Sequence, residues 1–206
     1  MNLANKLSFF RIILAPVFFV IYLLPRFFPS LFVNGAAWTV PVLWIISIVS
    51  EITDYFDGYA ARKLNLTSDF GKLLDPFADT LTQVTFFLCF IIDGIYPGGI
   101  FPAILFLLVI YREFAIMFLR NLMLKKGIAM GARIGGKIKT VIYIITAAIA
   151  LLISSIQRLN LERLDIFKLI LPYVKTGALV IFTISVVIAI ISFIDYFLIY
   201  RKTGAA

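Results

Sequence analysis

The sequence predicts an all-α integral membrane protein, a six-transmembrane-helix bundle with a cytoplasmic-side polar cavity and an N-terminal amphipathic helix. Hydrophobic residues make up 62% of the 206-residue chain, far above the roughly 45–50% usual for soluble domains. The mean hydropathy is +1.04, and apolar runs of membrane-spanning length recur along the chain. One dense polar stretch separates the second apolar run from the third. The length suits a single membrane domain, residues 1–206.

The apolar runs are separated by turn residues and charged segments. The first twelve residues, MNLANKLSFFRI, form a short amphipathic lead, and prolines and a glycine mark the loop after the first run. The sequence Tyr96-Pro97-Gly98-Gly99 predicts a turn after the third run. We therefore place the six spans at about residues 13–24, 36–52, 73–95, 101–124, 137–156 and 171–200.

The distribution of basic residues predicts the orientation. An even number of spans places both termini on one side of the membrane, and most Lys and Arg residues lie on that side. The opposite side has only Arg26, Arg158, Arg163, Lys168 and Lys175. Under the positive-inside rule the termini and the polar stretch face the cytoplasm, and the protein lies in the cell membrane. The formal net charge of +8 is explained by cytoplasmic loops near anionic head groups, so we expect no nucleic-acid partner.

The polar stretch runs from Asp54 to Asp79 and carries two spaced pairs of carboxylates. Asp54 and Asp57 are three residues apart, and Asp75 and Asp79 are four apart, so each pair shares one face of a helix. A carboxylate near hydrocarbon is costly and normally faces a cavity, an ion or a partner. Two such pairs on neighbouring helices suit a hard divalent cation, which prefers oxygen ligands. The chain has no histidine, so histidine has no catalytic or metal-binding role.

Small residues lie beside the first carboxylate pair. Gly58 and Ala61 fall on nearly the same helical stripe as the two aspartates, which leaves room for a ligand to approach the backbone. The alternative is a set of capping and surface aspartates neutralised by Arg62, Lys63 and Lys72. That alternative explains neither the small residues nor the double spacing.

A basic cluster follows in the fourth and fifth spans. Its members lie on the same membrane side as the aspartates and could hold a phosphate by charge-assisted hydrogen bonds; they are Arg112, Arg120, Arg133, Lys137 and Lys139. Two alternatives stay open: an ion pair between Arg112 and Glu113 inside the bundle, and snorkelling of Lys137 and Lys139 to the head groups. In the amphipathic lead, Asn5 and Ser8 could touch a ligand, or they could cap the helix.

The spacing D-x2-D-G-x2-A-R-x8-G-x3-D-x3-D resembles the signature of the CDP-alcohol phosphatidyltransferases, integral membrane enzymes with six spans. All eight specified positions are met, by Asp54, Asp57, Gly58, Ala61, Arg62, Gly71, Asp75 and Asp79. The motif covers a short part of the chain, and the span count extends the similarity to most of it.

This resemblance implies a reaction in which a CDP-linked lipid gives its phosphatidyl group to an alcohol and releases CMP. The four motif aspartates would hold one or two divalent ions, Mg²⁺ or Mn²⁺, and Asp79 would also take the proton of the attacking hydroxyl. The CDP-diacylglycerol pocket would be lined by Gly58, Ala61, Arg62 and Gly71, with a hydrogen bond from Ser68. The resemblance further implies a homodimer whose cavity opens laterally, so that the acyl chains stay in the membrane lipid.

Within the family, three features are similar to phosphatidylglycerophosphate synthases, whose acceptor is glycerol 3-phosphate. They are the opening MNLANKLSFFRI, the LDPFAD segment, and a fourth span with Arg-Glu followed by Gly-Lys-x-Lys. The acceptor phosphate would suit Arg112, Arg120, Lys137 and Lys139. The sequence departs at Thr80, where those enzymes commonly carry lysine.

Other functions remain as alternatives. Another polyol phosphate, such as inositol phosphate, would use the same basic cluster. From another class, an ion transporter could place carboxylates along its pathway, but here the acids gather at one membrane face and no two related halves are visible. A structural membrane protein without a ligand leaves the costly carboxylates unexplained.

Overall fold

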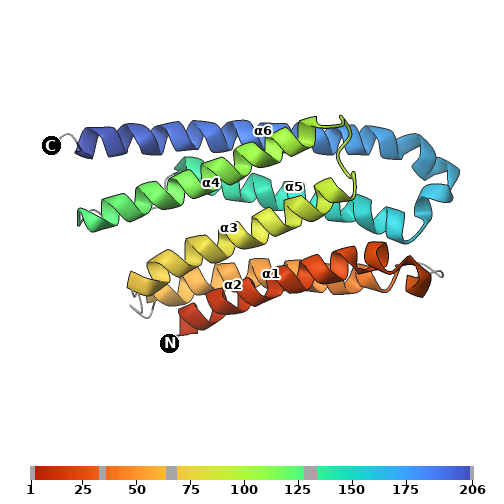
Figure 1. The fold of residues 1–206 in the computed structure, drawn as a ribbon, viewed down its shortest axis with the longest axis horizontal. Helices are drawn as coiled ribbons and strands as arrows, with labels where there is room; N and C mark the ends of the chain where they lie inside the picture. Colours follow the sequence, from red (N-terminus) through yellow and green to blue (C-terminus); the bar gives the residue numbers. More distant parts are fainter. Residues whose placement is uncertain (1–2, 33–35, 64–68, 128–133, 205–206) are drawn as a thin grey trace.

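The computed structural model describes residues 3–32, 36–63, 69–127 and 134–204, and these residues form a bundle of long α-helices (Figure 1). The elements are α1 (Leu3–Phe27), η1 (Pro29–Phe32), α2 (Thr39–Lys63), α3 (Asp69–Ile92), α4 (Phe101–Lys125), α5 (Ile134–Arg158), η2 (Leu161–Arg163) and α6 (Asp165–Gly204). All regular structure in the described ranges is helical, which confirms the all-α prediction.

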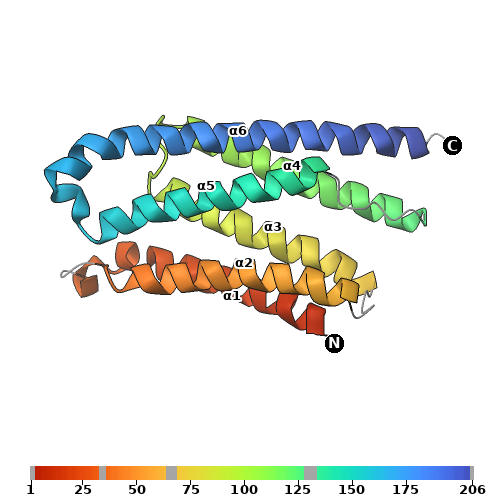
Figure 2. The ribbon, with the colours of Figure 1, turned by 180° about the vertical axis from the view of Figure 1, so that it is seen from behind.

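The helices run along the long axis of the molecule, and both termini lie at the same end (Figures 1 and 2). Helix α1 packs against α2 and α3, and α6 packs against α4 and α5. Helix α3 also contacts α4 and α5, so it connects the α1–α2 pair to the group formed by α4, α5 and α6. The end of α2, the start of α3 and the end of α4 meet at the end of the bundle that carries the termini (Figure 1).

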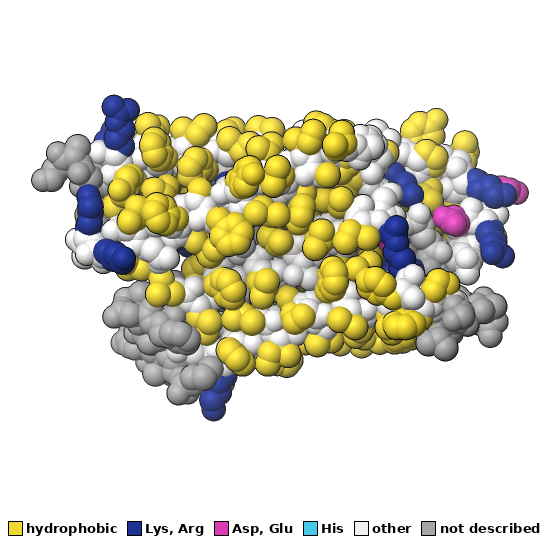
Figure 3. All heavy atoms as spheres, in the orientation of Figure 1, with side chains coloured by type: hydrophobic (Ala, Val, Ile, Leu, Met, Phe, Trp, Pro, Cys, Tyr) yellow, Lys and Arg dark blue, Asp and Glu magenta, His cyan; other side chains and the backbone are white. Residues whose placement is uncertain are grey.

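Five of the helices are long and apolar enough to cross a membrane, which indicates a multi-pass membrane protein. They span Asn5–Phe27, Leu73–Ile92, Phe101–Lys125, Gly135–Arg158 and Asp165–Lys202. Among the described residues α2 is not one of them, and its second half carries Asp54 and Asp57. On the face in Figure 3, apolar side chains cover the middle of the bundle and Lys and Arg side chains gather toward its two ends. This distribution fits a surface that contacts hydrocarbon in the middle and head groups at the ends.

The N-terminal lead is not a separate amphipathic helix, contrary to the prediction. Helix α1 continues without interruption from Leu3 to Phe27, across the lead and the first apolar run. The sequence contains no turn residues between the two segments that would end a helix. Pro16 lies inside α1, which is compatible with a membrane span because neighbouring groups can satisfy the freed backbone carbonyl.

Aromatic side chains of α3 connect the two helix groups through the core. Phe86 of α3 packs on Phe18 of α1, with ring centroids 4.2 Å apart. Phe87, the next residue, turns the other way and contacts Tyr143 of α5 and Phe182 of α6, at 5.3 Å and 5.0 Å. Buried aromatic pairs add to the stabilisation from apolar burial. These contacts fix α3, and with it the aspartates of its first half.

Arg158 joins three helices at the end of the bundle opposite the termini. Its guanidinium donates to the carbonyl of Tyr22 at 2.8 Å and to the hydroxyl of Thr39 at 3.1 Å. It also donates to Ser154 Oγ at 3.0 Å, and it lies 4.3 Å from the centroid of the Tyr22 ring. The Arg158 side chain is 9% exposed. One side chain thus connects α1, the start of α2 and α5.

Replacing Arg158 with methionine is expected to lower the thermal stability of the purified protein, because several buried acceptors lose their donor together. We expect a loss of about 2–4 kcal/mol, corresponding to a drop in Tm on the order of 5–15 °C for a chain of this size. Thermal unfolding in detergent measures the change. Arg163→Met, an exposed arginine at the same end, is the matched control and should leave Tm unchanged; equal effects of the two substitutions would contradict this account of Arg158.

Candidate active site

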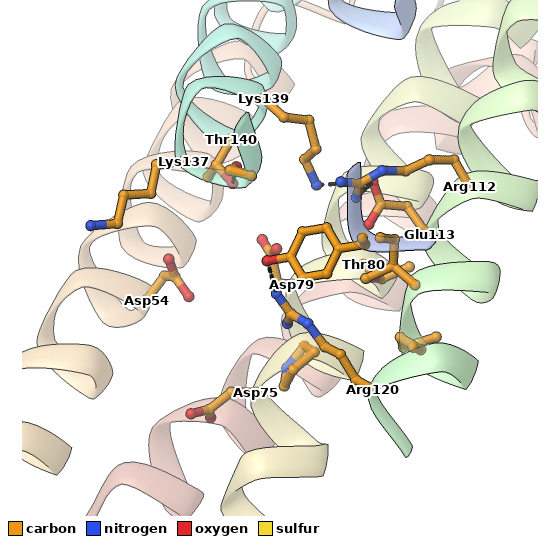
Figure 4. A pocket seen from close by; sticks show the side chains of 15 residues that line it. Asp54, Asp75, Asp79, Thr80, Arg112, Glu113, Arg120, Lys137, Lys139 and Thr140 are labelled. Atoms are coloured by element: carbon orange, nitrogen blue, oxygen red, sulfur yellow. Dashed lines mark hydrogen bonds and ion pairs between the residues drawn. The ribbon is translucent and has the colours of Figure 1, made fainter. Parts of the chain in front are cut away.

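A pocket of about 250 Å³ lies between the helices. Its lining residues belong to the second half of α2, the first half of α3, the second half of α4, the start of α5 and the end of α6, which are the helix halves nearer the two termini (Figure 1). Five helices, α2 to α6, contribute to its wall. Its lining residues are Asp54, Asp75, Pro76, Asp79, Thr80, Arg112, Glu113, Ile116, Met117, Arg120, Gly136, Lys137, Lys139, Thr140 and Tyr196. Acidic groups from α2 and α3 therefore share one hollow with basic groups from α4 and α5 (Figure 4).

Three of the four predicted aspartates line this pocket. Asp54 comes from α2, and Asp75 and Asp79 come from the first half of α3. The spacing of four residues places the α3 pair on one helical face, and both members reach the pocket. The side chain of Asp57, one turn after Asp54 on α2, lies outside the described part of the structure.

Residues of α1 bind two of these aspartates. Arg11 Nη1 donates to Asp54 Oδ1, and Ser8 Oγ donates to Asp75 Oδ1. Arg11 is almost fully buried, at 2% exposure. Ser8 thus contacts an aspartate of the pocket, and Arg11 is a site residue that the sequence did not single out. Their spacing of three residues on one helix face, in a segment leading into a membrane span, is the signal that could have indicated them.

Arg112 and Glu113 form a buried ion pair inside the bundle. Arg112 Nη1 lies 2.9 Å from Glu113 Oε1. The other guanidinium nitrogens of Arg112 donate to α6, Nε to the Ala189 carbonyl at 3.1 Å and Nη2 to Ser192 Oγ at 3.3 Å. All three nitrogens of this guanidinium are therefore engaged, so Arg112 connects α4 to α6 at the back of the pocket.

Lys139 is buried and does not extend to the membrane surface. Its Nζ lies 2.9 Å from Glu113 Oε1 and 3.3 Å from Gln83 Oε1. It also lies 4.5 Å from the centroid of the Tyr143 ring. Figure 4 shows its side chain extending toward Arg112 and Glu113. An ammonium group has three N–H donors, and two of them point to these oxygen acceptors.

Arg120 and Lys137 are the more accessible basic residues of the pocket. Arg120 is half-buried, and its Nη2 donates to the hydroxyl of Tyr196 at 3.2 Å. Lys137 is exposed at the start of α5 and lines the same pocket. The basic residues thus separate into a buried pair that binds Glu113 and an accessible pair at the pocket wall.

The start of α5 approaches α6 closely beside the pocket. A Cβ added to Gly135 would lie 3.4 Å from the side chain of Ser192, and one added to Gly136 would lie 3.7 Å from the Tyr196 hydroxyl. A Cβ at either position would make ordinary van der Waals contact, so the first turn of α5, just before Lys137 and Lys139, packs directly against α6.

Comparison with known proteins identifies the family. Residues 1–194 match the sequence profile described as CDP-alcohol phosphatidyltransferase. The chain belongs to the CDP-alcohol phosphatidyltransferase family. This match covers nearly the whole chain, so the resemblance first seen in the motif extends over all six long helices.

Individual members of the CDP-alcohol phosphatidyltransferase family are similar along most of their length. A CDP-diacylglycerol–glycerol-3-phosphate 3-phosphatidyltransferase from Treponema pallidum is 34% identical over 200 residues, covering 95% of this chain and 88% of the relative. A protein of the same name from Bacillus subtilis is 39% identical over 153 residues, covering 73% of this chain and 77% of the relative. A third, from Wigglesworthia glossinidia brevipalpis, is 37% identical over 127 residues, 62% of this chain and 63% of the relative.

Several of the predicted site residues lie partly or wholly outside the described part of the structure. Gly58, Ala61 and Arg62 belong to helix α2, but their side chains lie outside the described part. Ser68 and Arg133 lie outside the described residues altogether. Gly71 is buried in the first turn of α3. The roles predicted for these residues therefore remain predictions.

The carboxylates of the pocket suit a divalent cation by their chemistry. Three carboxylates from two helices line one hollow, and carboxylate oxygens are the ligands that Mg²⁺ prefers in proteins. Among the described side chains, no three His, Cys, Asp or Glu residues are grouped closely enough to hold an ion together. Arg11 and Ser8 occupy one oxygen each of Asp54 and Asp75. The donor atoms of these carboxylates are thus of the kind that a hard cation binds.

Proposed function

We propose that the protein transfers the phosphatidyl group of CDP-diacylglycerol to the hydroxyl of glycerol 3-phosphate, releasing CMP and forming phosphatidylglycerol phosphate. The observation that carries this proposal is the pocket itself, in which carboxylates face accessible basic residues within about 250 Å³. The names of the relatives from Treponema pallidum and Bacillus subtilis support glycerol 3-phosphate as the acceptor.

The proposal includes a topology. All six long helices cross the membrane, with both termini and the pocket on the cytoplasmic side of the cell membrane. Both termini lie at one end of the bundle (Figure 1), and the pocket is lined by the helix halves nearer that end. This placement supports the arrangement, as does the excess of Lys and Arg predicted at that end. The protein acts as a homodimer, as the family resemblance implies; cross-linking in native membranes tests that state.

The donor lipid would be held at the carboxylate side of the pocket. Asp54, Asp57, Asp75 and Asp79 would bind one or two Mg²⁺ or Mn²⁺ ions, and the cytidine diphosphate would lie against Gly58, Ala61, Arg62, Ser68 and Gly71. When bound, the ions supply positive charge that stabilises the pyrophosphate and the departing CMP. The planar guanidinium of Arg62 suits a phosphate group by geometry and charge.

The acyl chains of the donor have an apolar path beside the pocket. A groove between α3 and α4 is lined by Phe77, Thr80, Leu81, Val84, Ile110, Phe114 and Met117. Thr80 and Met117 also line the aspartate pocket, so the groove and the pocket adjoin. Phe77 and Phe114 are exposed on the outside of the bundle. An amphiphilic substrate could thus keep its head group in the pocket and its chains against lipid.

The phosphate of the acceptor would bind the basic side of the pocket. Arg120 and Lys137 are accessible there and would contact it directly, while Lys139 and Arg112 would add positive charge from behind. With the phosphate held on that side, one of the two free hydroxyls of glycerol 3-phosphate can reach Asp79 on the opposite wall.

Asp79 would act as the general base. It takes the proton of the acceptor hydroxyl as the oxygen attacks the phosphorus of the phosphatidyl group. A new O–P bond forms, the bond between that phosphorus and the oxygen of CMP breaks, and CMP leaves with the bonding electrons. An alcohol is a poor nucleophile until a nearby base removes its proton, and a positioned carboxylate provides that base.

Acceptor choice tests the proposal. Replacing Arg120 and Lys137 together with alanine is expected to raise the KM for glycerol 3-phosphate by about 10- to 100-fold, because charge-assisted hydrogen bonds to phosphate are lost. The KM for CDP-diacylglycerol should stay unchanged. Steady-state release of CMP with each substrate varied in turn gives both constants, and Lys175→Ala, at the opposite end of the bundle, is the control. Equal turnover of uncharged glycerol and glycerol 3-phosphate would contradict the phosphate site.

A further inference from the structure

Gln83 is a buried polar residue that contacts two pocket residues, Asp79 and Lys139, and the proposed reaction does not use it. It lies on α3 one turn after Asp79 and is 7% exposed. Residues four apart on a helix share a face, so its carboxamide can reach the Asp79 carboxylate. A carboxamide in such a place must satisfy both of its polar ends or lose stability.

The two ends of the Gln83 carboxamide bind two different charged groups, one a carboxylate and the other an ammonium. Its Nε2 donates to Asp79 Oδ1 at 2.7 Å, and its Oε1 accepts from Lys139 Nζ at 3.3 Å. The reverse orientation would place the amide oxygen against a carboxylate and the amide N–H groups against an ammonium. Both contacts would then be repulsive, so the two neighbours fix the amide in one orientation.

We infer that Gln83 is the positioning residue for Asp79: it holds one carboxylate oxygen and separates that carboxylate from the ammonium of Lys139. With Oδ1 held, Oδ2 is the oxygen directed to the acceptor hydroxyl. Lys139 stays bound to Glu113 at 2.9 Å and does not pair with the base. This inference rests on the proposed role of Asp79 as general base.

Three helices contribute to this arrangement, which gives it rigidity. Gln83 and Asp79 belong to α3, Glu113 to α4 and Lys139 to α5. The Arg112 guanidinium, which binds Glu113, is itself bound to α6. The orientation of the base is thus connected to the packing of the bundle, and catalytic groups need such support because small displacements reduce the rate strongly.

The substitution Gln83→Met tests the inference, because methionine keeps the length of the side chain and removes both hydrogen bonds. We expect kcat to fall about 10- to 100-fold, the effect of losing a hydrogen bond to a charged group. The KM values for both substrates should change by less than about twofold, since neither substrate contacts Gln83. Thr82→Val is the matched control. Thr82 is also buried on α3, and its hydroxyl donates to the Ala78 carbonyl of its own helix at 3.0 Å. The kcat of the Thr82→Val variant should stay normal.

A double-mutant cycle with Asp79→Asn separates positioning from a general structural effect. If Gln83 acts through Asp79, adding Gln83→Met to Asp79→Asn should leave the residual rate unchanged. A double variant whose loss of rate equals the product of the two single losses would overturn the inference. A normal kcat in Gln83→Met would overturn it as well. Should the methionine variant fail to fold, Gln83→Asn, which shortens the carboxamide by one methylene, should show the same loss of kcat with unchanged KM. An inactive parent protein would overturn the proposed function and this inference together, whereas an active parent with an unaffected Gln83→Met would overturn the inference alone.

Discussion

Replacing Asp79 with asparagine is expected to slow the release of CMP by about 100- to 10,000-fold, the contribution typical of a general base. Asparagine keeps the size of the side chain and an oxygen that can accept from Gln83, but it cannot take the proton of the acceptor hydroxyl. Binding of CDP-diacylglycerol should persist, because the other motif aspartates and the residues proposed to bind the cytidine diphosphate remain. Single-turnover release of labelled CMP measures the rate, and equilibrium binding of the labelled lipid measures retention of the donor.

The control for this substitution is Asp165→Asn. Asp165 lies at the start of α6, its side chain is 99% exposed, and it binds Lys168 at 3.2 Å. The same chemical change at this surface position should leave CMP release normal. Turnover by Asp79→Asn within about twofold of the parent, against the 100-fold minimum expected of a general base, would remove Asp79 from that role.

Removal of divalent cations is expected to abolish transfer, and added Mg²⁺ or Mn²⁺ is expected to restore it. The carboxylates of the pocket provide oxygen ligands for such an ion, and pyrophosphate without a counter-cation would be repelled by Asp54, Asp75 and Asp79. Dialysis against EDTA followed by stepwise addition of each cation measures the dependence.

A stability measurement tests the same metal site without relying on turnover. A ligand that binds only the folded protein stabilises it by about 2.7 kcal/mol at 100 times its Kd. Mg²⁺ should therefore raise the Tm of the parent protein and fail to raise that of the Asp54→Asn/Asp75→Asn variant. Full activity in EDTA, or an equal rise in Tm for both proteins, would contradict the metal site.

The sequence predicted the helical bundle well because apolar runs of membrane length leave few alternatives to helices. It predicted the helix ends less well: α6 begins at Asp165 and not near Leu171, and α1 includes the amphipathic lead. The apolar signal marks where hydrocarbon contact ends, whereas a helix can continue into the head-group region. Helix bounds and membrane bounds are therefore different quantities.

The site was predicted where the pattern is local and missed where it depends on tertiary contacts. The spacing of Asp75 and Asp79 fixes their shared face within one helix, and both line the pocket. By contrast, Ser8 and Arg11 reach aspartates 67 and 43 residues away in the chain. Their spacing places both residues on one face of α1, but the aspartates they contact depend on how α1 packs against α2 and α3.

The basic cluster shows a second limit of sequence reasoning. Arg112, Arg120, Lys137 and Lys139 look equivalent in the sequence, as cations on one membrane side. In the structure Glu113 binds both Arg112 and Lys139, which leaves Arg120 and Lys137 as the accessible pair. Charge counting could not separate the four residues, because one buried glutamate decides which cations it neutralises.

The most direct test of the central claim uses purified protein in mixed micelles with CDP-diacylglycerol, Mg²⁺ and glycerol 3-phosphate labelled in its glycerol carbons. We predict that the label moves into the lipid fraction and that CMP appears in equal amount, with both signals lost in Asp79→Asn. Label that stays water-soluble while the protein is folded and binds the donor lipid would contradict the account.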